Sequence, residues 1–141
     1  MRVLYHALRR NRNGIMYHME IRTEIPLHQY TTMRLGGTAH FMASATSVNE
    51  VRELYNSAKV QGIPIFVLGG GSNVIARDEG FAGAVLLNRI KGFEVLTDDG
   101  QTATIKVGAG EIWDEVVKRT VAMGLSGIEA LSAIPGTAGA A

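Results

Sequence analysis

The sequence contains no cysteine, few aromatic residues and no long hydrophobic run, and each absence narrows the possible functions. Without cysteine, a disulfide framework, a thiolate zinc site and a cysteine nucleophile are all excluded. No apolar stretch approaches the ~18 residues that a membrane-spanning helix needs, so we expect no membrane partner. A chain without disulfides fits a reducing compartment, and we expect a cytoplasmic protein.

The sequence also lacks an excess of charge of one sign. Lys and Arg total 14 and Asp and Glu total 13 in 141 residues, but residues 1–19 hold four arginines and no acid. The rest of the chain is therefore net negative, and since a nucleic-acid-binding domain carries a basic face, we expect no nucleic-acid partner. We interpret residues 1–22 as a basic, poorly ordered leader, some of which could precede a translation start at Met16 or Met19. Residues 23–141 form the predicted domain.

Hydrophobic patterning predicts an α/β (α+β) domain. Residues 39–43 are typical of a strand, and a helix begins after the capping-box pair Ser47 and Glu50 and ends at Gly62. The continuous apolar run 63–68 is typical of a strand covered on both faces. Strand, helix and strand in this order predict a βαβ unit. Further strands are expected at 74–76, 84–87, 93–96 and 102–107, and a second helix between residue 112 and Gly124.

Glycine is abundant, with 17 residues, and three of them follow the apolar run as Gly69, Gly70 and Gly71. Without side chains the backbone can approach a ligand closely, and successive amides can form an anion-binding nest. Ser72 and Asn73 add a hydroxyl and an amide. A simple turn needs only one or two glycines, so the sequence predicts a phosphate or pyrophosphate site over residues 69–73.

Two common phosphate-binding loops do not match this segment. A P-loop ends in Gly-Lys-Ser/Thr, and no lysine lies near Ser72. The dinucleotide fingerprint GxGxxG needs a third glycine where Val74 stands, and it runs into a helix, whereas the next segment here is predicted to be a strand. The pattern therefore indicates a glycine nest between two strands.

A second loop, residues 134–139, is a weaker candidate because an ordinary turn explains it equally well. Pro135 stiffens its entry, Gly136 and Gly139 allow close approach, and Thr137 offers a hydroxyl and an amide. Catalytic groups are scarce: His28 and His40 are isolated, and we expect no metal site. Asp114 and Glu115 are interpreted as first-turn acids that favour the positive end of a helix dipole.

Five segments together resemble the UDP-N-acetylenolpyruvoylglucosamine reductase family, also called UDP-N-acetylmuramate dehydrogenase. They are YTTMRLGG (30–37), VLGGGSNVIARDEGFAG (67–83), LNRIKGFEV (87–95), VGAGEIWDEVV (107–117) and GLSGIEALSAIPGTAGAA (124–141). The resemblance implies an FAD-binding fold of the vanillyl-alcohol-oxidase (PCMH) type, in which two small α/β subdomains clamp the flavin.

The resemblance also implies roles for residues in both loops. The glycine loop, Gly69, Gly70, Gly71, Ser72 and Asn73, would wrap the FAD pyrophosphate. Ile134, Pro135, Gly136, Thr137 and Gly139 would line a second flavin loop, and Thr32 would lie near the adenine-nucleotide side. Some members of the wider fold attach FAD through a histidine in the glycine loop; this loop has none, so we expect non-covalent FAD.

The family's reaction passes hydride from NADPH through FAD to an enolpyruvyl sugar nucleotide, giving UDP-N-acetylmuramate for peptidoglycan. The resemblance therefore implies NADPH as reductant and a small sugar nucleotide as substrate. The family's catalytic serine, arginine and carboxylate, and its substrate-binding domain, would follow residue 141. We accordingly expect an incomplete FAD-binding part that is inactive alone. Two alternatives stay open: another FAD-dependent oxidoreductase of the same fold, or a non-catalytic nucleotide-binding module.

Overall fold

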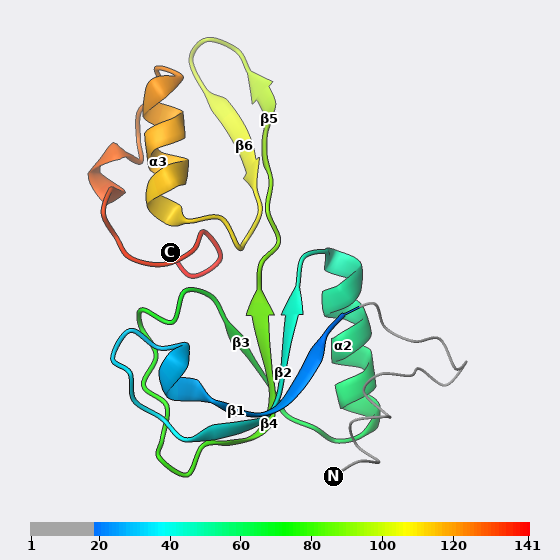
Figure 1. Ribbon diagram of the computed structural model, residues 1–141. Coiled ribbons are helices and arrows are strands. Elements are labelled where there is room, and N and C mark those ends of the chain that lie inside the picture. The colour runs from blue at the N-terminus through cyan, green and yellow to red at the C-terminus, as the bar shows by residue number, and fades with distance from the viewer. Residues whose placement is uncertain (1–18) are drawn as a thin grey trace.

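The computed structural model describes residues 19–141, which form two lobes (Figure 1). One lobe holds a four-stranded sheet and helix α2, and the other holds a hairpin and helix α3. The first lobe contains β1 (Ile21–Pro26), the 3-10 turn η1 (Leu27–Gln29), β2 (Thr38–Ala45), α2 (Val48–Val60), β3 (Ile65–Leu68) and β4 (Phe81–Asn88). The second contains β5 (Phe93–Asp98), β6 (Ala103–Val107), α3 (Trp113–Ala122) and the 3-10 turn η2 (Glu129–Leu131).

The sheet of the first lobe has the strand order β1-β2-β4-β3. Strands β2, β4 and β3 are parallel, and β1 adds to the edge in the antiparallel direction. Leu54 and Ala58 of α2 are buried in the hydrophobic cluster on one face of the sheet. A second cluster, on the other face, includes Leu27 of η1 and is covered by Val74 and Ala76. Both faces are therefore covered, as a largely parallel sheet requires.

Helix α2 begins as the sequence predicts. The Ser47 hydroxyl accepts a hydrogen bond from the Glu50 amide at 3.3 Å. The Glu50 carboxylate in turn accepts hydrogen bonds from the Ser47 and Thr46 amides at 3.1 and 2.6 Å. This reciprocal pairing satisfies amides that the first turn of a helix leaves without partners. The same bonds, that from Thr46 above all, lower the pKa of the Glu50 carboxyl.

We expect Ser47→Ala to lower the free energy of unfolding by about 1 kcal/mol, since an alanine N-cap leaves the Glu50 amide without its acceptor. Urea titration followed by circular dichroism measures the change. Asn49→Ala is the matched control, because Asn49 is exposed in the same turn. A Ser47→Ala variant as stable as the wild type would contradict the capping role.

The boundary predicted for the leader is wrong at its carboxyl end. Residues 1–18 lie outside the described residues, but Met19 and Ile21 are 4 % and 2 % exposed and belong to the first hydrophobic cluster. Ile21 also begins β1, where it pairs with Ala43 of β2. The folded part therefore begins no later than Met19. The sequence did not predict these core positions because they directly follow an arginine-rich segment.

Two strand predictions also need correction. The run 63–68 contributes only β3, an edge strand in which Phe66 and Val67 are 42 % and 54 % exposed. Strand β4, by contrast, is covered on both faces, and its residues 83–87 are all buried. Residues 74–76 pair with no strand in the described part of the chain. Their apolar pattern arises because Val74 and Ala76 pack over the sheet.

The second lobe consists of the antiparallel β5–β6 hairpin, helix α3 and the following loops. Val116, Val117 and Thr120 of α3 are buried, whereas Ile112, directly before the helix, and Val121 are 54 % and 52 % exposed. Gly124, at φ +75°, follows the helix end. No helix within residues 19–141 is both long and apolar enough to cross a membrane.

Candidate functional site

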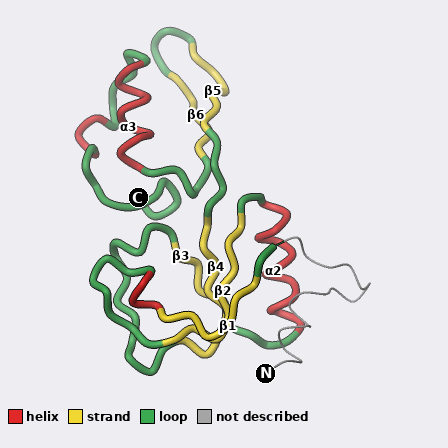
Figure 2. The backbone as a smooth tube through the Cα atoms, viewed as in Figure 1, coloured by secondary structure: helices red, strands yellow, loops and turns green. Residues whose placement is uncertain are grey.

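The glycine loop, residues 69–73, follows β3 at the end of the sheet that faces the second lobe (Figures 1 and 2). The backbone amides of residues 70–73 donate no hydrogen bond to any residue within 19–141. Gly71 is nevertheless buried. Since a buried amide without an acceptor is costly, this row of donors suits a ligand that brings oxygen acceptors.

The C-terminal loop, residues 134–139, lies beside the glycine loop and runs in the opposite direction. The Ser72 hydroxyl donates to the Pro135 carbonyl at 3.0 Å. A Cβ built on Gly70 would lie 3.4 Å from Gly136 Cα, and one built on Gly69 would lie 2.6 Å from Thr137 Oγ1. The amides of Gly136 and Thr137 also donate no hydrogen bond to another described residue. The glycine loop and the C-terminal loop, together called the paired loops, therefore offer backbone amide donors from both lobes to a ligand.

The three glycines of the glycine loop differ in whether the surrounding protein leaves room for a side chain. Gly71 adopts φ +72°, and a Cβ there would overlap the Tyr30 carbonyl oxygen. A Cβ on Gly69 would crowd Thr137. Gly70, by contrast, is exposed, avoids the left-handed region and has room for a Cβ against Gly136. The protein itself therefore gives no steric reason for glycine at position 70.

A third segment, which contains Thr32, supports the glycine loop by hydrogen bonds to its carbonyl groups. The Thr32 amide donates to the Gly71 carbonyl at 3.0 Å, and the Thr32 hydroxyl lies 3.4 Å from the carbonyl oxygens of Gly71 and Ser72. These contacts fix the carbonyls of the loop on one side. The structure thus brings Thr32 to the predicted site.

The segment before α3 holds the C-terminal loop against the second lobe. The Trp113 amide donates to the Gly136 carbonyl at 3.2 Å, and the Ala138 amide donates to the Glu111 carbonyl at 2.8 Å. The Gly139 amide donates to the Ala109 carbonyl at 3.0 Å, and a Cβ on Gly139 would lie 2.7 Å from Ala109 Cβ. Gly139 is therefore explained by packing within its own lobe.

The structure brings most of the predicted site residues into direct contact. Thr32, Gly69, Gly70, Gly71, Ser72, Pro135, Gly136 and Thr137 form the paired loops and their support. Asn73 and Ile134 are exposed beside them, and Gly139 lies at the far end of the second loop. His28 and His40 are exposed, and no group of His, Asp and Glu within residues 19–141 could hold a metal ion.

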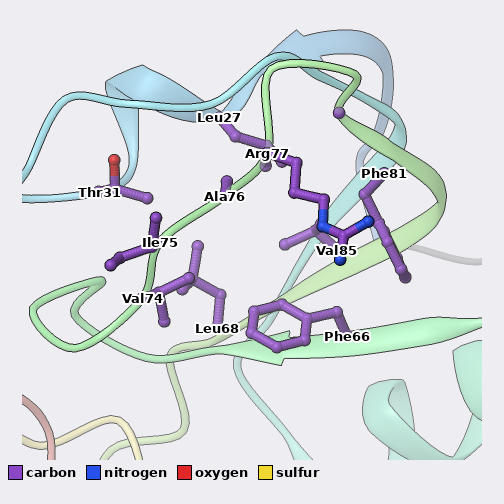
Figure 3. Close-up of a pocket in the computed structure, with 11 residues that line it drawn as sticks. Leu27, Thr31, Phe66, Leu68, Val74, Ile75, Ala76, Arg77, Phe81 and Val85 are labelled. Atoms are coloured by element: carbon purple, nitrogen blue, oxygen red, sulfur yellow. The ribbon is translucent and has the colours of Figure 1, made fainter.

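An apolar pocket of about 210 Å³ lies behind the glycine loop, between residues 74–81 and the sheet (Figure 3). Phe66, Leu68 and Val85 line its sheet side, and Arg77 extends into it. Its one hydroxyl, that of Thr31, already donates to the Leu35 carbonyl at 3.0 Å. The pocket offers few polar groups to orient a ligand, so the paired loops are the better candidate site.

Sequence reasoning missed the contribution of Asp114. Its carboxylate accepts the Ser132 hydroxyl at 2.7 Å and the Ala133 amide at 2.8 Å, and it pairs with Lys118 at 2.9 Å. These bonds, the Ala133 amide first, hold the pKa of the Asp114 carboxyl well below its ordinary value. The position in the first turn of a helix gave no signal of a partner 19 residues away.

Comparison with known proteins identifies relatives of the chain. Residues 39–141 match the FAD binding domain family. The chain is 48 % identical over 117 residues to the UDP-N-acetylenolpyruvoylglucosamine reductase of Salinispora arenicola, covering 83 % of this chain and 32 % of that protein. It is 42 % identical over 125 residues to the enzyme of the same name from Streptomyces avermitilis, covering 89 % and 33 %. The chain thus spans about a third of the length of these relatives.

Solved structures give the same result. The structure of UDP-N-acetylenolpyruvylglucosamine reductase from Thermus caldophilus superposes with a TM-score of 0.59 at 32 % identity, covering 86 % of this chain and 40 % of that one. A solvent-stable cholesterol oxidase gives a TM-score of 0.53 at 15 % identity, covering 77 % and 21 %, and so shares the fold alone. The predicted fold class and family resemblance are confirmed. The chain belongs to the FAD binding domain family, and within it the chain matches the FAD-binding part of UDP-N-acetylenolpyruvoylglucosamine reductases.

Proposed function

We propose that this chain binds FAD non-covalently, with the diphosphate of the cofactor on the paired loops. The observation that carries the proposal is the row of amides at residues 70–73, beside those of Gly136 and Thr137, which donate no hydrogen bond to any residue that the structure describes. A diphosphate brings several oxygen acceptors and negative charge, which such a nest of amides binds well. The two loops come from different lobes, so one extended ligand would join them.

The side chains of the loops are consistent with diphosphate binding by the backbone amides. The Ser72 hydroxyl uses its proton on the Pro135 carbonyl, so it holds the loops together and leaves phosphate binding to the amides. Thr32 holds the opposite side of the glycine loop through its amide. The absence of a side chain at Gly70 leaves the backbone open to a ligand.

We further propose that the chain serves as the FAD-binding part of a UDP-N-acetylenolpyruvoylglucosamine reductase acting in the cytoplasm. FAD would supply the hydride transfer, with NADPH as reductant and an enolpyruvyl sugar nucleotide as acceptor. The residues of this chain would bind and orient the cofactor. The relatives' names and the sequence resemblance support this assignment.

Titration of the purified chain with FAD tests the cofactor proposal. We expect saturable quenching of flavin fluorescence and release of intact FAD on acid denaturation. Riboflavin, which lacks the diphosphate, should bind at least about tenfold more weakly, as expected when a charged group loses several hydrogen bonds. ADP should compete with FAD. Absence of FAD binding, or equal affinity for riboflavin, would contradict the placement of the diphosphate.

A further inference from the structure

The backbone takes an unusual conformation directly before the C-terminal loop. Ala133 adopts φ +63°, a left-handed conformation that residues with a Cβ rarely occupy. Two residues later the Pro135 carbonyl accepts the Ser72 hydroxyl. The turn at Ala133 thus sets the direction in which the chain approaches the glycine loop.

The start of α3 holds this turn through side chains. Asp114 Oδ1 accepts both the Ser132 hydroxyl, at 2.7 Å, and the Ala133 amide, at 2.8 Å. The indole Nε1 of Trp113 donates to the Leu131 carbonyl at 2.9 Å. Two consecutive helix residues therefore bind three consecutive residues, 131–133, directly before the C-terminal loop.

The same helix start also binds the loop beyond the turn, since the Trp113 amide donates to the Gly136 carbonyl. Residues 133–136 are therefore fixed at both ends by α3, and the part between them reaches toward Ser72. Lys118 pairs with Asp114 Oδ2 at 2.9 Å, which leaves Oδ1 for the loop.

A role for Asp114 in the helix dipole alone does not explain this arrangement. Glu115 is an acid in the same turn and also pairs with Lys118, at 2.7 Å, yet it makes no hydrogen bond to residues 131–139. Both carboxylates are placed to stabilise the helix dipole, but of the two only that of Asp114 accepts hydrogen bonds from Ser132 and Ala133.

We infer that Asp114 is a positioning residue for the FAD site: it holds Ala133 in the left-handed conformation and so docks the C-terminal loop on the glycine loop. The consequence for FAD rests on the proposed function, whereas the docking of the loop does not. The inference assigns Asp114 no contact with the cofactor.

The test compares Asp114→Ala with Glu115→Ala in the full chain. Trp113 is the single tryptophan, and its indole bond to Leu131 makes its fluorescence a reporter of loop docking. We expect Asp114→Ala to increase acrylamide quenching of Trp113 and to speed exchange of the Ala133 amide by about tenfold. FAD affinity should fall by about three- to tenfold. Glu115→Ala should change none of the three.

Two further variants separate positioning from a general loss of structure. Asp114→Asn keeps an oxygen acceptor at the same position and should restore most of the docking. Ala133→Gly, added to Asp114→Ala, should recover part of the FAD affinity, because glycine adopts positive φ without a Cβ penalty. Circular dichroism confirms that each variant is folded.

The outcomes distinguish the inference from the proposed function. If the wild type does not bind FAD, the proposed function fails, and the quenching and amide-exchange measurements still test the loop docking. If the wild type binds FAD and Asp114→Ala matches it in quenching and exchange, the positioning role is overturned. Equal losses in Asp114→Ala and Glu115→Ala would overturn it as well, since they would indicate a dipole effect.

Discussion

Gly70→Val is expected to abolish detectable FAD binding while leaving the free energy of unfolding almost unchanged. Gly70 is exposed and lies outside the left-handed region, and its Cβ position is 3.4 Å from Gly136 Cα, an ordinary contact. A Cβ therefore fits at this position without a positive-φ penalty. Its branched side chain would project from the middle of the paired loops, where we place the diphosphate.

Flavin fluorescence titration measures the effect, and we expect affinity to fall by at least about 100-fold, equivalent to about 2.7 kcal/mol. Gly70→Ala is the graded control: its single methyl group should weaken binding less than valine does. Urea unfolding of both variants shows whether the fold is kept. FAD affinity for Gly70→Val within a few-fold of the wild type would refute the placement of the cofactor on this loop.

Local chemistry allowed both loops to be predicted from the sequence, but not their contact. Three successive glycines after an apolar run indicate a backbone that approaches something closely. That this neighbour includes the Pro135 segment depends on a hydrogen bond between residues 63 positions apart. Such a contact arises from the packing of one lobe against the other, and neither loop carries a pattern that specifies it.

The same limit explains the errors in the predicted strands. Hydrophobicity reports that a side chain avoids water, and it does not report whether the backbone pairs. Val74 and Ala76 pack over the sheet without joining it, and Phe66 lies on an edge strand while partly lining the apolar pocket. The Ser47 and Glu50 capping box was predicted correctly because both partners lie within one helical turn.

Asp114 shows how one residue can satisfy two patterns. An acid in the first turn of a helix is favourable for the helix dipole, and this sufficient local explanation hid the bonds to Ser132 and Ala133. Glu115 has the same local pattern without those bonds. Only the three-dimensional arrangement separates the two acids.

Gly71→Ala is expected to destabilise the fold by about 3 kcal/mol, unlike substitution of its neighbour Gly70. Two costs add: about 1 kcal/mol for an alanine at φ +72°, and about 1–3 kcal/mol for overpacking. The overpacking arises because the new Cβ would overlap the Tyr30 carbonyl oxygen, which belongs to the segment that supports the glycine loop. Thermal and urea unfolding measure the loss.

Gly62→Ala is the matched control for this prediction. Gly62 adopts φ +67°, nearly the same conformation as Gly71, but a Cβ there would meet no atom of residues 19–141 within 4 Å. Its substitution therefore carries only the conformational cost, about 1 kcal/mol. The difference between the two variants isolates the collision with Tyr30. Equal losses in the free energy of unfolding for the two variants would show that the loop relaxes around the new Cβ. Close packing against Tyr30 would then not be the reason for glycine at position 71.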